Sequence, residues 1–235
     1  ATAVVQSAVI GGVFNTAGAI TNAASRLGPG DVILIELQAT GPRNRYVAMQ
    51  YWDDTYSAIL ATVARGITVV EAAGNGGENF DHRDYRGSGL QKDSGAIVVG
   101  AGVPPTNHFD IDRNYDNIGV PRSRIWFSNY GKIVNLQAWG WHVTTTGYGD
   151  AQGGGEDRWY TMRFSGTSSA SPIVTGAVAC VQGYALAKRG RPLTPDQVRQ
   201  LLVKTGTPQV AGPGVPLSQH IGPQPNLAAA ARKVR

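Results

Sequence analysis

Short apolar runs alternate along the chain with longer segments whose apolar residues recur at helical spacing. Uninterrupted apolar runs are typical of strands buried on both faces of a sheet. The runs expected to form strands are residues 2–10, 32–37, 68–73, 96–101 and 133–138. Helical spacing marks residues 15–28 and 45–66, and each of these segments ends in glycine. The alternation predicts an α/β domain whose mostly parallel sheet carries helices on both faces.

A later helix is marked by explicit start and stop residues. Thr194, Pro195 and Gln197 form a start signal, because the threonine hydroxyl and the glutamine amide can satisfy free backbone donors. Gly206 is expected to end this helix. Its apolar residues Val198, Leu201 and Leu202 share one face, which is expected to pack on the core.

Length and composition favour one domain over residues 1–235. The chain has 235 residues, 42% of them apolar, which is enough for one sizeable core. It has a single cysteine, so an internal disulfide is excluded. Cys180 lies in an apolar helical stretch and is predicted to be a small core residue rather than a nucleophile.

Charge and hydropathy argue against nucleic-acid and membrane partners. The formal charge is +5, but the 21 lysines and arginines are scattered, and the densest cluster is the C-terminal "ARKVR". No apolar run reads as long enough to span a bilayer, and no charged start precedes an apolar leader. A nucleotide-binding α/β protein is also disfavoured, because no glycine-rich phosphate loop follows the first strand.

The stretch "RFSGTSSASP" places a serine where a nucleophile would be useful. Gly166 allows a sharp turn, and Pro172 is expected in the first turn of a helix that starts there. Ser168 is then at a helix N-terminus, whose N–H groups and dipole favour a developing oxyanion. From these residues alone Ser168 is equally well explained as a helix N-cap.

A second stretch, "VVEAAGN", supports the nucleophile. It is predicted to end a buried strand, so Asn75 is expected to project into a crevice at the carboxyl end of the sheet. An amide there can donate a hydrogen bond to an oxyanion formed at Ser168.

Together these motifs resemble the subtilisin-like serine proteases, the subtilase family. The family's nucleophile motif is Gly-Thr-Ser-x-Ala-Ser-Pro, and its oxyanion asparagine follows Ala-Ala-Gly, as Asn75 does. The resemblance continues through "GDVILIEL", "SGAIVVGAG", "FSNYGKIVNLQAWG", "TPDQVRQLL" and "PNLAAAA". The nucleophile motif is matched by Gly166, Thr167, Ser168, Ala170, Ser171 and Pro172.

The resemblance implies a role for each matched position. Ser168 would attack the scissile carbonyl to form an acyl-enzyme, and Asn75 would stabilise the oxyanion. The pocket for the residue before the cleaved bond would have walls formed by Leu37, Gln38, Ala72, Ala73 and Gly74. Two residues depart from the family's pattern: Glu36 stands where a small serine is usual, and Gln38 where a glycine is usual.

The rest of the family's triad is not matched. The family takes its Asp from Asp-(Ser/Thr)-Gly and its His from His-Gly-Thr, and both precede the oxyanion asparagine. All four histidines follow Asn75, and Asp93-Ser94-Gly95 precedes a predicted strand, so it is interpreted as a turn. The histidines, expected in loops, are His82, His108, His142 and His220.

Residues 2–10 resemble the strand that follows the family's His-bearing helix. The subtilisin-like three-layer fold is therefore expected to be incomplete without N-terminal strands, and the chain to be the larger C-terminal part of one peptidase domain. We expect a companion segment to supply Asp and His, and the chain by itself to be nearly inactive and poorly ordered.

Three further expectations remain open. The alternative function is a catalytically dead subtilase fold used for binding or as a scaffold. Residues 110–117, "DIDRNYDN", offer oxygen ligands that suit calcium, although a solvated acidic loop is favoured over a metal site. By family habit the parent protein would act on proteins or peptides and be secreted as a precursor with an inhibitory propeptide.

Overall fold

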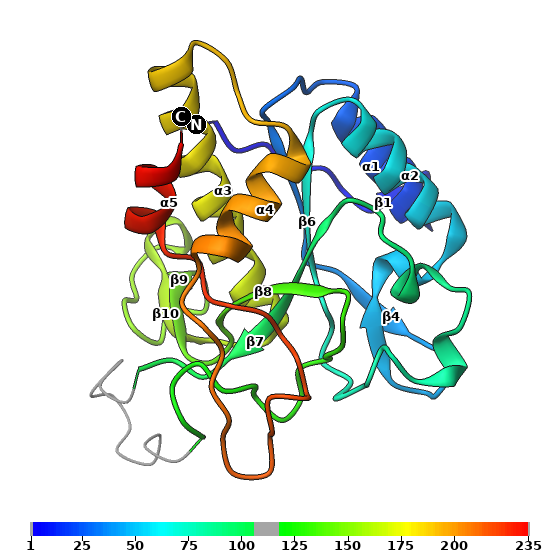
Figure 1. Ribbon diagram of the computed structural model, residues 1–235, viewed down its shortest axis with the longest axis vertical. Helices are drawn as coiled ribbons and strands as arrows, with labels where there is room; N and C mark the ends of the chain where they lie inside the picture. The colour runs from blue at the N-terminus through cyan, green and yellow to red at the C-terminus, as the bar shows by residue number, and fades with distance from the viewer. Residues whose placement is uncertain (1, 106–117, 235) are drawn as a thin grey trace.

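The computed structural model describes residues 2–105 and 118–234 of the chain. Its centre is a parallel four-stranded sheet, and the two middle strands are buried along their whole length. This confirms the predicted α/β class (Figure 1). The strand order is β3 (Val32–Ile35), β6 (Thr68–Ala72), β7 (Ile97–Gly102) and β8 (Val134–Trp139).

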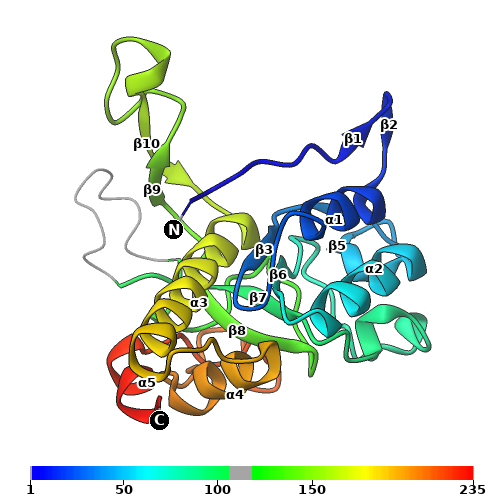
Figure 2. The same ribbon diagram turned by 90° about the horizontal axis from the view of Figure 1, so that it is seen from above.

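Helices cover both faces of this sheet (Figure 2). On one face α1 (Thr16–Ala24) and α2 (Asp53–Ala64) share a core with Ile33, Ile35 and Val69. On the other face lie α3 (Thr167–Arg189), α4 (Pro195–Thr205) and α5 (Leu227–Lys233). Successive residues of a strand point to opposite faces of the sheet. Because helices cover both faces, consecutive residues of these strands are apolar.

The α4 start signal is confirmed. The Thr194 hydroxyl accepts from the Gln197 N–H, and the Gln197 side chain accepts from the Thr194 N–H. Gly206 follows the last turn. The reciprocal hydrogen bonds satisfy two donors that the helix itself leaves unpaired.

The long helix α3 corrects two expectations. This helix of 23 residues is long and apolar enough to cross a membrane by length and composition alone, so the expectation that no apolar run is long enough is wrong. The helix contacts β3, β6, β7 and β8, and residues such as Val174, Val178 and Val181 are buried against them. Cys180 lies on the opposite face and is exposed, because the helical period turns it away from that buried stripe.

The predicted strand over residues 2–10 is wrong. Only β1 (Val9–Ile10) is paired there, with β2 (Val13–Phe14), and this small hairpin stands outside the central sheet (Figure 2). Val5 is 94% exposed. Apolar character alone does not make a strand, which needs a neighbouring backbone to pair with. In the described part of the chain β3 pairs only with β6, so its outer edge is unpaired.

The predicted helix over residues 45–66 is also wrong in its first half. β4 (Gln38–Thr40) pairs with β5 (Tyr46–Ala48), the 3₁₀ turn η1 (Met49–Tyr51) follows, and α2 begins only at Asp53. Val47 and Ala48 are fully buried. The hairpin pairing with β4 is a contact from outside the window, and it overrides local helical spacing.

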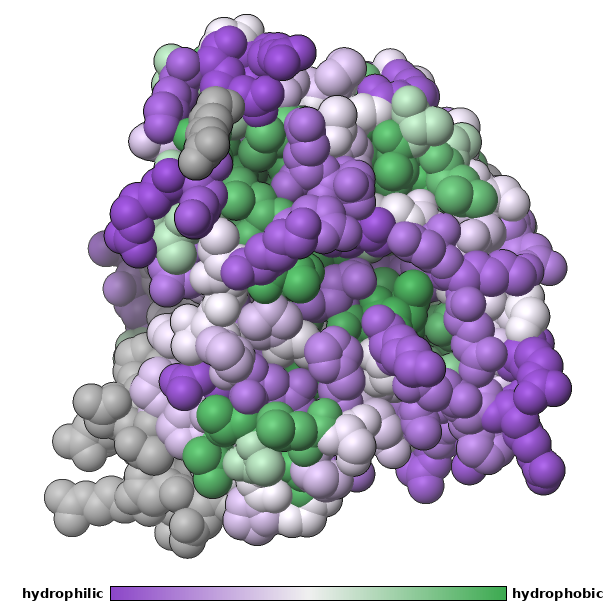
Figure 3. Space-filling view, in the orientation of Figure 1, coloured by the Kyte–Doolittle hydropathy of each residue, from purple (hydrophilic) through white to green (hydrophobic). Residues whose placement is uncertain are grey.

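On the viewed face of Figure 1 the surface is mostly polar, with apolar side chains in separate patches (Figure 3).

The remaining elements are short. A second hairpin projects from the body beside the N-terminal end of α3 (Figure 2). These elements are η2 (Arg83–Tyr85), η3 (Gly89–Gln91), β9 (Val143–Thr146), η5 (Glu156–Arg158) and β10 (Tyr160–Phe164).

Candidate active site

Ser168 is the second residue of α3. The helix begins after Gly166, whose φ of 108° is left-handed and suits glycine, and no side chain caps this end. Ser168 is therefore not the N-cap. Its hydroxyl donates to the backbone carbonyl of Glu36 over 3.1 Å. Pro172 lies inside the helix rather than in its first turn, because the helix starts at Thr167, five residues earlier than the proline.

The side chain of Asn75 is oriented toward the start of α3. Its Oδ1 accepts from the Thr167 N–H over 2.8 Å and from the Thr167 hydroxyl over 3.0 Å. A Cβ placed on Gly166 would lie 3.1 Å from Asn75 Nδ2, so the amide group lies against that glycine. With its oxygen occupied, the amide presents its N–H donors beside the first turn of α3.

Thr167 links the two chain segments. Its hydroxyl accepts from the Gly74 N–H over 3.0 Å and donates to Asn75 Oδ1, and the residue is fully buried.

We expect Thr167→Val to lower the free energy of unfolding by about 1–3 kcal/mol, because it leaves the buried Gly74 N–H unpaired. Thr167→Ser keeps the hydroxyl and is the matched control. Urea unfolding of the two variants checks this, and a Thr167→Val protein as stable as the parent would show that the hydroxyl's hydrogen bonds contribute little.

Asn129 is a structural residue of the site that sequence reasoning missed. Its Nδ2 donates to the carbonyls of Ala73 and Tyr46, over 2.7 and 2.8 Å. Its Oδ1 accepts from the N–H groups of Gly76 and Glu78, over 3.1 and 2.8 Å. One buried amide thus holds the loop that carries Asn75. The four partners are distant in sequence, so no local pattern predicts them.

The predicted pocket walls are only partly brought together. Gln38 reaches the site, since its Oε1 accepts from the Asn75 N–H over 2.7 Å. Leu37 packs against the core under α1 and α2. Ala72, Ala73 and Gly74 are buried, and Gly74 lies against Val47 and Asn129.

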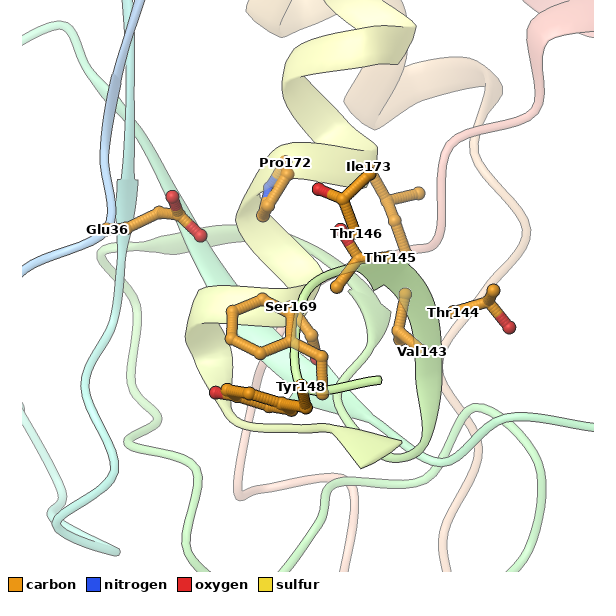
Figure 4. A pocket seen from close by; sticks show the side chains of 10 residues that line it. Glu36, Val143, Thr144, Thr145, Thr146, Tyr148, Ser169, Pro172 and Ile173 are labelled. Carbon is orange, nitrogen blue, oxygen red and sulfur yellow. The ribbon is translucent and has the colours of Figure 1, made fainter. Parts of the chain in front are cut away.

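A cleft of about 470 Å³ lies between Glu36 and the first turns of α3, and Ser169, the residue after Ser168, lines it (Figure 4). Glu36 forms one wall, while β9, Phe164 of β10 and the first turns of α3 form the others. The Glu36 side chain remains accessible, yet the surrounding protein desolvates its carboxyl enough to raise its pKa above the ordinary value of 4.5.

The described histidines lie elsewhere, and Ser168 Oγ hydrogen-bonds to none of them. His82 Nδ1 is 3.3 Å from both Arg43 Nη1 and the Asp84 carboxylate. Burial lowers the pKa of His220, and His142 donates its backbone N–H to the Ser165 hydroxyl. His108 is outside the described residues.

Two further predictions concern the turn at Asp93 and a calcium site in residues 110–117. The turn at Asp93 is confirmed, because its carboxylate accepts from the Gly95 N–H over 2.8 Å and pairs with Arg199 over 2.6 Å. The calcium candidate, residues 110–117, lies outside the described residues. Within residues 2–105 and 118–234, no three His, Cys, Asp or Glu side chains cluster as a metal site would require.

Comparison with known proteins shows the family of the chain. The sequence model of the Subtilase family matches residues 11–222, so the chain belongs to the subtilase family. An extracellular serine proteinase of a Thermus species is 34% identical over 155 residues, which are 66% of this chain and 30% of that protein. An intracellular serine protease of Paenibacillus polymyxa is 32% identical over 168 residues, or 69% of this chain and 43% of that protein.

Solved structures show the same fold. The patellamide maturation protease PatA aligns with a TM-score of 0.62 at 21% identity, covering 94% of this chain and 69% of that one. A protease from Pseudoalteromonas arctica aligns with a TM-score of 0.63 at 21% identity, covering 93% of this chain and 58% of that one. The chain spans less than half the length of the Thermus and Paenibacillus proteases, one of which is named extracellular and the other intracellular.

Proposed function

We propose that this chain carries the nucleophile and oxyanion hole of a serine endopeptidase acting on protein or peptide substrates. The observation that supports this best is the junction of Asn75, Thr167 and Ser168. There the Asn75 amide oxygen is held by two hydrogen bonds from Thr167, the residue before Ser168, which leaves the amide N–H groups to donate to an oxyanion formed at that serine. These hydrogen bonds also serve the fold, but a scaffold needs neither a serine at position 168 nor an amide donor next to it.

The reaction follows from the positions of these groups. Ser168 Oγ attacks the substrate carbonyl carbon, a base takes the hydroxyl proton, and the carbonyl oxygen becomes an oxyanion. Asn75 Nδ2 and the backbone N–H of Ser168 donate to that oxygen, since the N–H groups of Thr167 and Ser169 are already bonded to Asn75 Oδ1 and the Gly166 carbonyl. Collapse of the intermediate expels the amine, which takes up the proton, and water then hydrolyses the acyl-serine.

The base and its carboxylate partner are proposed to come from a companion segment that carries His and Asp. Two observations support this. The described hydrogen-bond partner of Ser168 Oγ is a backbone carbonyl, which cannot act as the base at neutral pH. The outer edge of β3 also has no partner strand in the described part of the chain, and that strand leads directly to Glu36 beside the serine.

A fluorophosphonate probe tests the proposal. The protein is purified without denaturation, together with any polypeptide that accompanies it, and labelled before denaturing mass spectrometry. We expect one adduct on Ser168, none in Ser168→Ala, and unchanged labelling in Ser218→Ala, which changes an exposed serine. Absence of an adduct when a His-bearing segment is present would favour the binding or scaffold function instead.

A further inference from the structure

The side chain of Gln38 reaches across the site to the backbone of Asn75. Gln38 is the first residue of β4, and its Oε1 accepts from the Asn75 N–H over 2.7 Å. Because the partner is an N–H donor, the side chain must present its oxygen, which defines the orientation of the glutamine amide. Both residues are partly buried, so this hydrogen bond is shielded from competing water.

This hydrogen bond completes the fixation of the loop formed by residues 73–77. Glycines stand on both sides of Asn75, and a glycine backbone takes many conformations unless other segments hold it. Every backbone N–H of this loop donates to a different segment of the chain. The acceptors, in order from Ala73 to Gly77, are the Val99 carbonyl, the Thr167 hydroxyl, Gln38 Oε1, Asn129 Oδ1 and the Phe127 carbonyl.

Asn75 is thereby held at both of its ends. Its side-chain oxygen accepts from Thr167, and its backbone N–H donates to Gln38. Within residues 2–105 and 118–234, its Nδ2 group has no hydrogen-bond partner, so these N–H donors are free for a ligand. A donor for an oxyanion is most effective when it is aimed before the charge develops, because reorientation during the reaction costs free energy.

The strand that carries Gln38 is itself fixed. It pairs with β5, in which Val47 is fully buried. Val47 lies against the loop of Asn75, since a Cβ placed on Gly74 would be 3.0 Å from the Val47 carbonyl carbon. Between the two strands, Arg43 Nε pairs with the Glu78 carboxylate over 2.8 Å. A side chain on such a strand can set the position of its partner rather than follow it.

We propose that Gln38 is a positioning residue, which holds the Asn75 backbone so that Nδ2 meets the oxyanion formed at Ser168. This inference rests on the proposed endopeptidase function. It assigns a role to a position where the subtilase family usually has glycine, which has no side chain to reach Asn75. Both hydrogen-bonded atoms belong to described residues, so the inference does not depend on what occupies the cleft beside Glu36.

Removal of the acceptor tests this role. Gln38→Met keeps the length of the side chain but lacks the amide oxygen, and it should slow fluorophosphonate labelling of Ser168 about 3- to 10-fold, the effect of one lost neutral hydrogen bond. The maximal labelling rate should fall while the probe concentration at half-maximal rate stays the same, because Nδ2 meets full negative charge only after the serine attacks. Gln38→Ala, which cannot crowd the site, should give the same result.

The proteins are purified with any accompanying polypeptide, and urea unfolding is measured for each variant. Gln200→Met, an exposed change on α4, is the matched control and should label at the parental rate.

A double-mutant cycle separates positioning from a structural contribution. Asn75→Ala keeps the backbone N–H that Gln38 binds but lacks the oxyanion donor. Gln38→Met should therefore have no further effect on the rate in this background, whereas a purely structural loss would appear in both backgrounds. Parental labelling by Gln38→Met, or an equal loss in both backgrounds, would overturn the inference and leave the endopeptidase function standing. No labelling of the parent protein would overturn both.

Discussion

Asn75→Ala is expected to slow acylation of Ser168 about 10²–10³-fold, the loss found when one oxyanion donor is removed from a subtilisin, a relative of this chain. The physical reason is that Nδ2 of Asn75 meets negative charge that exists only after Ser168 attacks. Substrate affinity should change little, because the ground-state carbonyl carries much less charge. The measurement is the rate of fluorophosphonate labelling, compared with the parent protein.

A matched control separates this effect from general damage. Asn22 on α1 is exposed, and Asn22→Ala should label at the parental rate. Asn75→Ala also removes the acceptor for Thr167, so urea unfolding of each variant must accompany the rates. Labelling at the parental rate by a folded Asn75→Ala protein would remove Asn75 from the oxyanion hole.

Glu71→Gln is expected to stabilise the protein at alkaline pH. Glu71 is fully buried in β6, its Oε2 accepts from the Gln50 N–H over 3.3 Å, and its Oε1 has no hydrogen-bond partner in the described structure. Burial raises the pKa of this carboxyl from 4.5 to about 8. The folded state therefore favours the protonated form, whereas the unfolded chain ionises at the ordinary value.

The sign of the pH dependence follows from this difference. A raised folded-state pKa contributes stability that is complete below pH 4.5 and is lost progressively as pH rises to about 8. An amide cannot ionise, so Glu71→Gln should unfold at a higher urea concentration than the parent at pH 8. The free energy of unfolding should be larger by on the order of 2–4 kcal/mol. At pH 4.5 the two proteins should differ little.

Urea unfolding of both proteins from pH 4.5 to 9 provides the measurement. Glu156→Gln, an exposed change on η5, is the control and should leave the pH profile as in the parent. A parallel profile for Glu71→Gln and the parent would mean that Glu71 is not held protonated. The result also bears on the site. Gln50, whose N–H donates to Glu71, follows β5, and Gln38 of the paired strand β4 accepts from the Asn75 N–H.

The contrast between correct and incorrect predictions has a consistent cause. The strands from Val32, Thr68, Ile97 and Val134 were predictable because a buried parallel strand needs a continuous apolar run. The strand β5 at the start of residues 45–66 was not predictable, because it exists only through pairing with β4. The same holds for residues 2–10, of which only Val9–Ile10 are paired, in a hairpin outside the central sheet.

The sequence by itself determined the α/β class, the capped helix at Thr194, and the motifs around Asn75 and Ser168, because each depends on residues that are neighbours in the chain. Only the tertiary structure decided how Thr167 and Asn129 hold Asn75, which face of α3 exposes Cys180, and that Glu36 faces a cleft beside the serine. Those features depend on contacts between distant segments. Their geometry arises when packing brings the segments together, and no local periodicity encodes it.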